Sequence, residues 1–188
     1  MEKKEARRQV QEAVRGLTAE ERAAKSAAIC ERLCRLPELQ AAKVVMGFLS
    51  MPDELDTFPI LGDLIADGKR VYVPRTSVRQ RRMIAVRLTD MKALRPGEYG
   101  ILEPDTEETC GVSEIDFVLV PARAFDRHGN RLGRGAGFYD RFMARKGFRA
   151  VRCGIAFACQ VLPEIPHGES DLPVQILVTE RDTHRFPA

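Results

Sequence analysis

The stretch IDFVLVPARAFDRHGNRLGRGAGFYDRFMARKG, residues 115–147, decides the fold because it joins an apolar strand to a helix through a glycine-rich loop. Its first part, DFVLVP at 116–121, is almost continuously apolar, and so is VQILVT at 174–179. Such runs are typical of strands that are covered on both faces, as in a parallel sheet. The stretch therefore predicts an α/β protein whose functional loops follow the ends of its strands.

Strands and helices alternate along the rest of the chain. We expect helices over residues 4–15, 19–35, 57–67 and 139–146, and strands over residues 43–49, 70–74, 83–88, 115–121, 151–157 and 174–179. Thr18 and Glu21 are spaced to form a capping box at the start of the second helix, and Pro37 marks the region where that helix ends.

No linker rich in proline and serine divides the chain, and PGEYGILEPDTEET at 96–109 is interpreted as a surface loop. The chain has 188 residues, of which 44% are hydrophobic and 30% are charged, as in ordinary soluble domains. We therefore predict a single layered domain over residues 1–188, with a largely parallel central sheet flanked by helices.

Charge and composition narrow the function classes. The formal net charge of +3 is too small to favour nucleic acid or a membrane surface as the main partner, although a local basic cluster still suits a phosphorylated small molecule. The charged N-terminus lacks the apolar core of a secretory signal, and no apolar run reaches the roughly 20 residues of a membrane span. We expect a cytoplasmic protein. Its five cysteines include no CxxC pair and are expected to be reduced packing residues.

The glycines at positions 133, 135 and 137 alternate, so they match neither the GxGxxG dinucleotide fingerprint nor a P-loop, which needs GK[ST]. Glycine lets backbone N–H groups approach an anion closely, and the following helix start adds unpaired N–H groups. Arg131 and Arg134 bring guanidinium groups that suit phosphate oxygens. The loop is a candidate phosphate cradle, and a tight turn that only packs the helix on the sheet is the alternative.

Two aspartates are candidate magnesium ligands. Asp140 lies at the start of the expected helix, and Asp171 precedes the last apolar strand. Mg²⁺ takes one or two carboxylates and fills its other positions with water and phosphate oxygens. Each aspartate taken alone also suits a structural role, such as capping a helix.

Four stretches together resemble the 5-formyltetrahydrofolate cyclo-ligase family, also called methenyltetrahydrofolate synthetase: GFLSMPDELDT (47–57), YGILEP (99–104), FDRHGNRLGRGAGFYDRF (125–142) and LPEIPHGESDLPVQILVTE (162–180). The resemblance implies a fold similar to the NagB/RpiA group. It also implies that 5-formyltetrahydrofolate is cyclised to 5,10-methenyltetrahydrofolate through phosphorylation of its formyl oxygen, with ATP as co-substrate, Mg²⁺ as cofactor, and ADP and phosphate as products.

The resemblance also implies roles for particular residues. The residues that match the family's ATP site are Lys3, Arg7, Arg131, Leu132, Gly133, Arg134, Gly135, Ala136, Gly137, Phe138 and Tyr139. Those that match its folate site are Leu49, Met51, Glu54, Arg134, Gly135, Ala136, Gly137 and Phe138. Asp140 and Asp171 match its magnesium ligands, and Arg131 and Arg134 match catalytic cations.

The chain departs from the family pattern at two positions. Ala136 stands where many members carry a lysine, so Arg131 or Arg134 must supply the missing phosphate-binding cation, and Phe138 stands where tyrosine is common. Two alternatives stay open: a non-catalytic folate-binding relative, and an RNA-associated or ligand-sensing domain of the same fold. The register of the N-terminal cations also stays open between Lys3 with Arg7 and Lys4 with Arg8. We expect a monomer.

Overall fold

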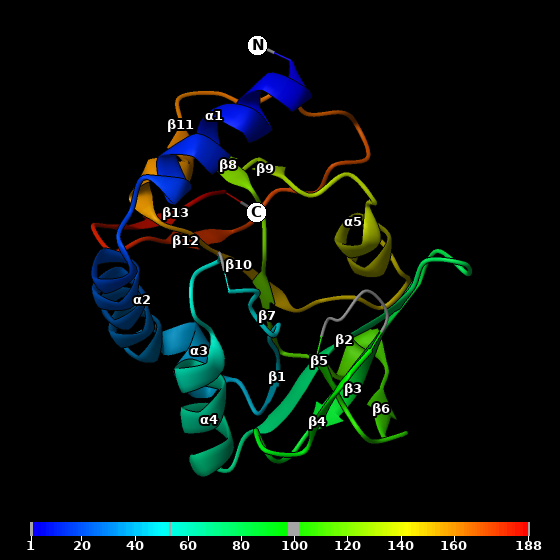
Figure 1. Cartoon of the computed structure of the whole chain (residues 1–188). Helices are drawn as coiled ribbons and strands as arrows, with labels where there is room; N and C mark the ends of the chain where they lie inside the picture. The colour runs from blue at the N-terminus through cyan, green and yellow to red at the C-terminus, as the bar shows by residue number, and fades with distance from the viewer. Residues whose placement is uncertain (1, 53, 98–101, 188) are drawn as a thin grey trace.

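The computed structural model describes residues 2–52, 54–97 and 102–187, and an eight-stranded sheet lies at its centre (Figure 1). The strand order is β13-β12-β10-β7-β1-β2-β3-β6. These strands are β1 (Val44–Met46), β2 (Arg70–Ser77), β3 (Arg82–Leu88), β6 (Thr109–Cys110), β7 (Phe117–Val120), β10 (Val151–Ile155), β12 (Ile176–Val178) and β13 (Thr183–Arg185). The strands from β12 to β2 are parallel, and β13, β3 and β6 pair antiparallel at the edges. The predicted α/β fold class is confirmed.

Strand β7 shows why the apolar runs are continuous. Phe117 and Leu119 belong to one core cluster, whereas Val118 and Val120 belong to the cluster on the opposite face. All four residues are fully buried. Because successive side chains of a strand point to opposite faces, a strand covered on both sides needs an apolar residue at every position.

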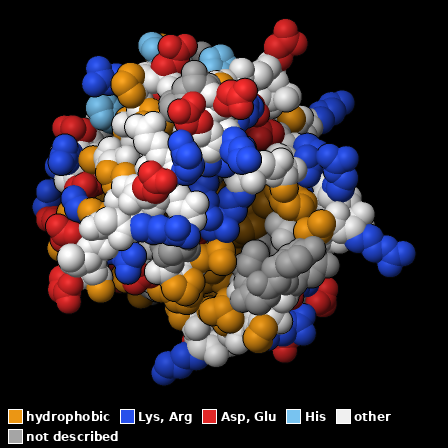
Figure 2. All heavy atoms as spheres, turned by 45° about the horizontal axis from the view of Figure 1, so that its top comes forward, with side chains coloured by type: hydrophobic (Ala, Val, Ile, Leu, Met, Phe, Trp, Pro, Cys, Tyr) orange, Lys and Arg blue, Asp and Glu red, His pale blue; other side chains and the backbone are white. Residues whose placement is uncertain are grey.

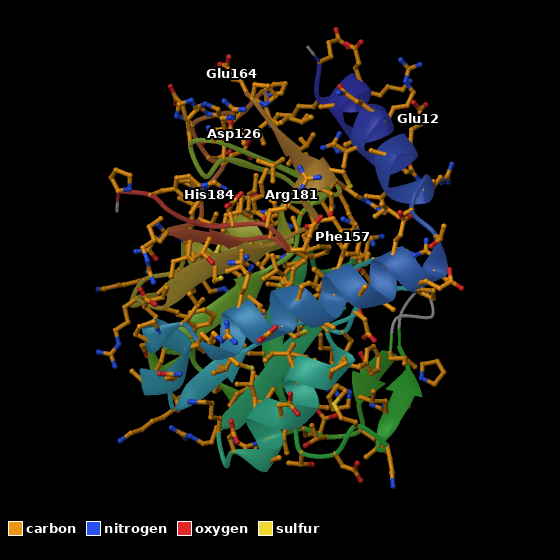
Figure 3. The ribbon with its side chains drawn as sticks, turned by 90° about the vertical axis from the view of Figure 1, so that its left-hand side faces the viewer. Glu12, Asp126, Phe157, Glu164, Arg181 and His184 are labelled. Carbon is orange, nitrogen blue, oxygen red and sulfur yellow. The ribbon has the colours of Figure 1, made fainter. Side chains whose placement is uncertain are left out.

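The helices are α1 (Lys3–Arg15), α2 (Ala19–Cys34), α3 (Pro37–Ala41), α4 (Phe58–Ala66) and α5 (Phe138–Met143). Helices α2, α3 and α4 cover one face of the sheet, and α5 packs on the other. Helix α1 covers a small sheet of β8 (Ala124–Asp126), β9 (Arg131–Leu132) and β11 (Val161–Leu162). In Figure 3, Glu12 lies on the outward side of α1, whereas Phe157 lies inside the molecule. No helix within the described ranges is long and apolar enough to cross a membrane.

The predicted capping box of α2 is confirmed. The Thr18 hydroxyl accepts from the Glu21 N–H at 3.1 Å, and the Glu21 carboxylate accepts from the Thr18 N–H at 2.8 Å. Helix α2 ends at Cys34, and Pro37 lies in the first turn of the next helix, α3. Proline fits there because the N–H it lacks has no partner in the first turn of a helix.

The interpretation of residues 96–109 as a surface loop is wrong in part. Strand β4 (Leu94–Pro96) pairs with β5 (Leu102–Pro104), and β6 begins at Thr109, while residues 98–101 lie outside the described part of the chain. Ion pairs reinforce the short pairing, since Arg95 binds Asp105 at 3.0 Å and Arg75 of β2 binds Glu103 at 3.5 Å. Both strands are only three residues long and each ends in a proline, so local propensity does not reveal them.

Candidate functional site

Two loops meet at the ends of β1 and β9. The loop after β1 is closed by Thr57, a fully buried residue whose hydroxyl donates to the Phe48 carbonyl at 2.6 Å. The same hydroxyl accepts from the Ser50 N–H at 3.1 Å, and the Ser50 hydroxyl accepts from the Thr57 N–H at 3.1 Å. This reciprocal pairing fixes the loop that carries Glu54.

A cavity of about 440 Å³ opens beside this loop. All three predicted folate-site residues of the loop, Leu49, Met51 and Glu54, line it. The other described residues that line it are Ser50, Pro52, Asp56, Phe58 and Leu102. A cavity of several hundred cubic ångströms with apolar walls and two carboxylates, Glu54 and Asp56, suits a flat heterocycle that has N–H donors.

The glycine loop has the backbone that its sequence predicts. Gly135 and Gly137 have φ values of 109° and 64°, and Gly137 precedes the first residue of α5. A side chain other than hydrogen is strained in such a conformation. Figure 2 shows Lys and Arg side chains gathered at the centre of this face, beside a hollow lined with hydrophobic side chains.

Helix α1 places one cation at the glycine loop and another at Asp171. The Arg7 guanidinium donates through Nε to the Gly133 carbonyl at 2.9 Å, and Lys3 Nζ binds Asp171 Oδ2 at 2.7 Å. Lys4 and Arg8, by contrast, are exposed. The structure therefore brings Lys3 and Arg7 to the site rather than their neighbours in the sequence.

The two candidate magnesium ligands lie close together. Asp140 Oδ1 accepts from the Leu172 N–H at 3.0 Å, and Leu172 directly follows Asp171 in the chain. Burial acts to raise the pKa of Asp171, but hydrogen bonds from Lys3 and the Gly168 N–H outweigh it and hold that pKa below its ordinary value. Asp171 therefore stays charged, and each carboxylate keeps a second oxygen, Asp140 Oδ2 and Asp171 Oδ1, beyond these contacts.

This donor set fits Mg²⁺, which needs only one or two carboxylates beside water and phosphate oxygens. Within the described ranges, no group of three or more His, Cys, Asp or Glu side chains could hold a metal ion by itself. The site therefore suits an ion that is bound partly by the two carboxylates and partly by a phosphorylated substrate. It does not suit a metal that protein side chains alone enclose.

The two arginines of the loop occupy different environments. The Arg131 side chain is 4% exposed and binds Asp140 at 2.5 Å, whereas the Arg134 side chain is 47% exposed and binds Glu54. Near Arg131, the hydroxyl of Tyr139 is buried without a hydrogen-bond partner in the described part of the chain. Burial raises the pKa of Tyr139, so its hydroxyl stays protonated.

Sequence reasoning missed Asp126, which organises the loop between β8 and β9. Its fully buried carboxylate accepts from the N–H groups of His128, Asn130 and Ile165, at 2.9, 3.0 and 3.2 Å, and from the Asn130 side chain at 3.0 Å. The signal was present in DRHGN at 126–130, because Asp, Gly and Asn are typical turn residues. The exposed His128 joins this network through its backbone.

Solved structures with the same fold are methenyltetrahydrofolate synthetases. The NMR structure of Aquifex aeolicus 5,10-methenyltetrahydrofolate synthetase has a TM-score of 0.87 and 32% identity, covering 100% of this chain and 94% of that one. The 5,10-methenyltetrahydrofolate synthetase of Mycoplasma pneumoniae has a TM-score of 0.78 at 18% identity, covering 96% and 99%, which shows likeness of fold alone. By its fold, the chain is an α/β protein of the methenyltetrahydrofolate synthetase type.

Sequence comparison leads to the same family. The 5-formyltetrahydrofolate cyclo-ligase of Mus musculus is 32% identical, covering 93% of this chain and 91% of its own length. The 5-formyltetrahydrofolate cyclo-ligase of Escherichia coli strain K12 is 32% identical, covering 88% and 93%. The model of the 5-formyltetrahydrofolate cyclo-ligase family matches residues 1–180. The chain belongs to this family, which confirms both the resemblance and the prediction of an enzyme of folate one-carbon metabolism.

Proposed function

We propose that the protein cyclises 5-formyltetrahydrofolate to 5,10-methenyltetrahydrofolate with ATP and Mg²⁺, and that it acts as a single-domain monomer. One observation carries the proposal beyond family membership. The glycine loop and the apolar cavity meet where Arg134 contacts Glu54, so a phosphate held by the loop would lie beside a heterocycle held in the cavity.

The reaction needs activation because an N-formyl amide is a poor electrophile and its oxygen a poor leaving group. The formyl oxygen attacks the γ-phosphorus of ATP, and ADP leaves. N10 then attacks the activated carbon, the oxygen departs as phosphate, and N10 loses its proton. Phosphoryl transfer of this kind is catalysed mainly by positioning the reactants and neutralising charge, so no nucleophilic side chain is required.

The roles of the residues follow from their surroundings. Glu54 accepts from N–H donors of the pterin, while Leu49 and Met51 hold its faces. The loop N–H groups and the cations that reach the loop, which include Arg134 and Arg7, bind the phosphates. Arg134 is half exposed, whereas Arg131 is buried on Asp140, so Arg134 supplies the cation that the family lysine would otherwise supply.

Asp140 and Asp171 would hold Mg²⁺, which when bound neutralises charge on the phosphate oxygens. Arg131 and the Leu172 N–H orient the Asp140 carboxylate through Oδ1. Lys3 and the Gly168 N–H orient that of Asp171 through Oδ2. The aspartates therefore do not depend on the ion to keep their positions.

Absorbance of the methenyl product tests the proposal. Purified protein with 5-formyltetrahydrofolate and MgATP should produce this band, and EDTA should abolish it. Asp140→Ala should lower the rate at least about 100-fold in a folded protein, as expected when charge stabilisation of the transition state is lost. Glu164→Ala, at an exposed acid outside the glycine loop and the cavity lining, is the control and should retain the rate. A flat trace with folded wild-type protein would refute the proposal.

A second candidate function is that of a folate-binding relative without turnover. Ala136 favours it, because alanine lacks the cation that many family members have at this position of the glycine loop. Calorimetric titration separates the two functions. Binding of 5-formyltetrahydrofolate with no ADP released from MgATP would favour the non-catalytic relative.

A further inference from the structure

Arg134 and Glu54 lie 80 residues apart in the chain, yet their side chains form an ion pair between the glycine loop and the apolar cavity. Arg134 donates to Glu54 Oε1, and the Met51 N–H donates to Glu54 Oε2 at 3.0 Å. Both oxygens of this carboxylate therefore have a donor. A heterocycle that donates N–H groups to Glu54 has to displace one of the two.

Arg134 is the donor that is easier to displace. The Met51 N–H belongs to a closed turn, because the Glu54 N–H also donates back to the Met51 carbonyl at 2.9 Å. The reciprocal hydrogen bonds between Ser50 and Thr57, which flank this turn in the chain, hold its two ends together. The Arg134 guanidinium, in contrast, lies at the end of a flexible side chain that is 47% exposed.

Displacement of Arg134 leaves the loop backbone in place. Arg7 holds the Gly133 carbonyl on one side of Arg134, and the Arg131 pair with Asp140 ties the strand before the loop to the helix after it. The freed guanidinium therefore remains within the phosphate cradle. A phosphate is its natural new partner, since arginine binds phosphate oxygens through two parallel hydrogen bonds.

We propose that Arg134 is a phosphate-binding residue that exchanges partners. It pairs with Glu54 when no ligand is bound, and it turns to the ATP phosphates when the folate occupies Glu54, so that each substrate strengthens binding of the other. The inference rests on the proposed function. By linkage, the folate should raise nucleotide affinity by the same factor by which the nucleotide raises folate affinity. A partly exposed ion pair sets that factor at about two- to five-fold.

Calorimetry with a non-hydrolysable ATP analogue and Mg²⁺ tests the exchange, with and without saturating 5-formyltetrahydrofolate. The wild-type protein should bind the analogue about two- to five-fold more tightly when the folate is present, and the factor should shrink at high salt. Glu54→Gln should bind the analogue more tightly than wild type in the absence of folate, and the folate should add nothing further. Arg134→Gln should bind it weakly in both cases.

Glu38→Gln is the matched control, because Glu38 forms a comparably exposed ion pair with Arg185 on another face and should leave the coupling as in wild type. Equal affinities with and without folate in the wild-type protein would overturn the inference and leave the proposed reaction untouched. Coupling that persists in Glu54→Gln would also overturn it, since it would then come from contact between the ligands. Failure of folded wild-type protein to bind either ligand would overturn the proposed function as well.

Discussion

Asp126 and Tyr139 are buried polar residues in opposite situations. The Asp126 carboxylate accepts four hydrogen bonds, whereas the Tyr139 hydroxyl has no partner in the described part of the chain. A satisfied buried group stabilises a protein, and an unsatisfied one costs the desolvation of the group. Removing these two groups should therefore have opposite effects.

Asp126→Asn should lower the free energy of unfolding by about 3 kcal/mol, because the amide turns an acceptor into a donor that faces N–H groups and removes a charge that strengthens four hydrogen bonds. Urea denaturation measures this loss. The control is Asp116→Asn, at an exposed carboxylate that accepts from the N–H groups of Lys43 and Val44, with an expected loss below about 1 kcal/mol. Equal losses in the two variants would contradict the account.

Tyr139→Phe should leave stability unchanged or raise it by up to about 1 kcal/mol at pH 7. Because burial raises the pKa of Tyr139, the folded protein resists ionisation of this group. Above the ordinary tyrosine pKa of about 10, the unfolded chain ionises this group while the folded protein does not, so the free energy of unfolding of wild type falls as pH rises. The variant has no such group, so its stability should increase relative to wild type above about pH 10. Alkaline titration followed at 295 nm should show one tyrosine of the wild-type protein that does not ionise near pH 10. The variant should lack this tyrosine. Ionisation of that tyrosine near pH 10 would contradict this.

At the scale of single elements, two glycines are predicted to respond with opposite signs. A Cβ at Gly154 of β10 would lie 2.5 Å from the fully buried ring of Phe125, whereas a Cβ at Gly62 of α4 would meet nothing within 4 Å. Gly154→Ala should lower the free energy of unfolding by about 1–3 kcal/mol through overpacking. Gly62→Ala should raise it by up to about 1 kcal/mol, because alanine favours a helix. Thermal denaturation checks both, and changes of the same sign would be evidence against this packing.

The contact between α1 and the site provides a prediction that depends on pH. Lys3→Met removes the partner that lowers the pKa of Asp171, so it should cost at most about 1 kcal/mol at neutral pH, since the pair is partly exposed. Because the pKa of Asp171 is lower in the folded than in the unfolded protein, its ionisation stabilises the fold at pH values above the unfolded pKa, near 3.9. This stabilisation disappears as pH falls through the pKa of the folded state. Wild type and Lys3→Met should therefore converge in acid when their urea denaturation is compared.

The neighbouring residue provides the control for α1. Lys4→Met, at an exposed position one residue further along, should leave both stability and ATP affinity unchanged, whereas Lys3→Met should weaken ATP binding. Calorimetric titration with the non-hydrolysable ATP analogue compares the two variants. Equal effects of the two substitutions would reject the register that the structure favours.

At the scale of the whole molecule, positive charge is concentrated on one side. The β2–β3 hairpin, which projects to the right in Figure 1, contacts helix α5. The hairpin, α5 and the residues that follow α5 carry seven cations, here called the basic face: Arg79, Arg81, Arg82, Arg141, Arg145, Lys146 and Arg149. Arg141 Nε donates to the Arg81 carbonyl at 3.3 Å, which joins the two elements. Within residues 2–52, 54–97 and 102–187, none of the seven forms an ion pair. Because the chain total is only +3, the rest of the molecule is net acidic.

The small net charge is therefore no argument against an anionic partner, and the absence of a nucleic-acid partner stays a prediction. Reversing Arg79 and Arg82 to glutamate should lower the salt concentration at which the protein elutes from immobilised heparin, because both lie in the basic face. The same reversal at Lys4 and Arg8, outside that face, changes the net charge equally and should have less effect. Equal shifts would mean that net charge alone governs retention.

The sequence by itself determined the α/β class, the covered strands, the capping box of α2 and the glycine loop. These features depend on residues that are close together in the chain. The apolar run at 116–121 needs no distant partner to be recognised as a strand covered on both faces, and the Thr18 and Glu21 pair is local. The family resemblance added the site residues, because a long run such as HGNRLGRGAGFYDR is specific.

Only the tertiary structure decided which of these residues meet. It buried Arg131 on Asp140 and left Arg134 half exposed beside Glu54, although the two arginines are three positions apart. It also turned Lys3 rather than Lys4 toward Asp171. The physical reason is the same in each case: burial and ion pairing depend on partners that are distant in the chain, and only the folded chain brings them together.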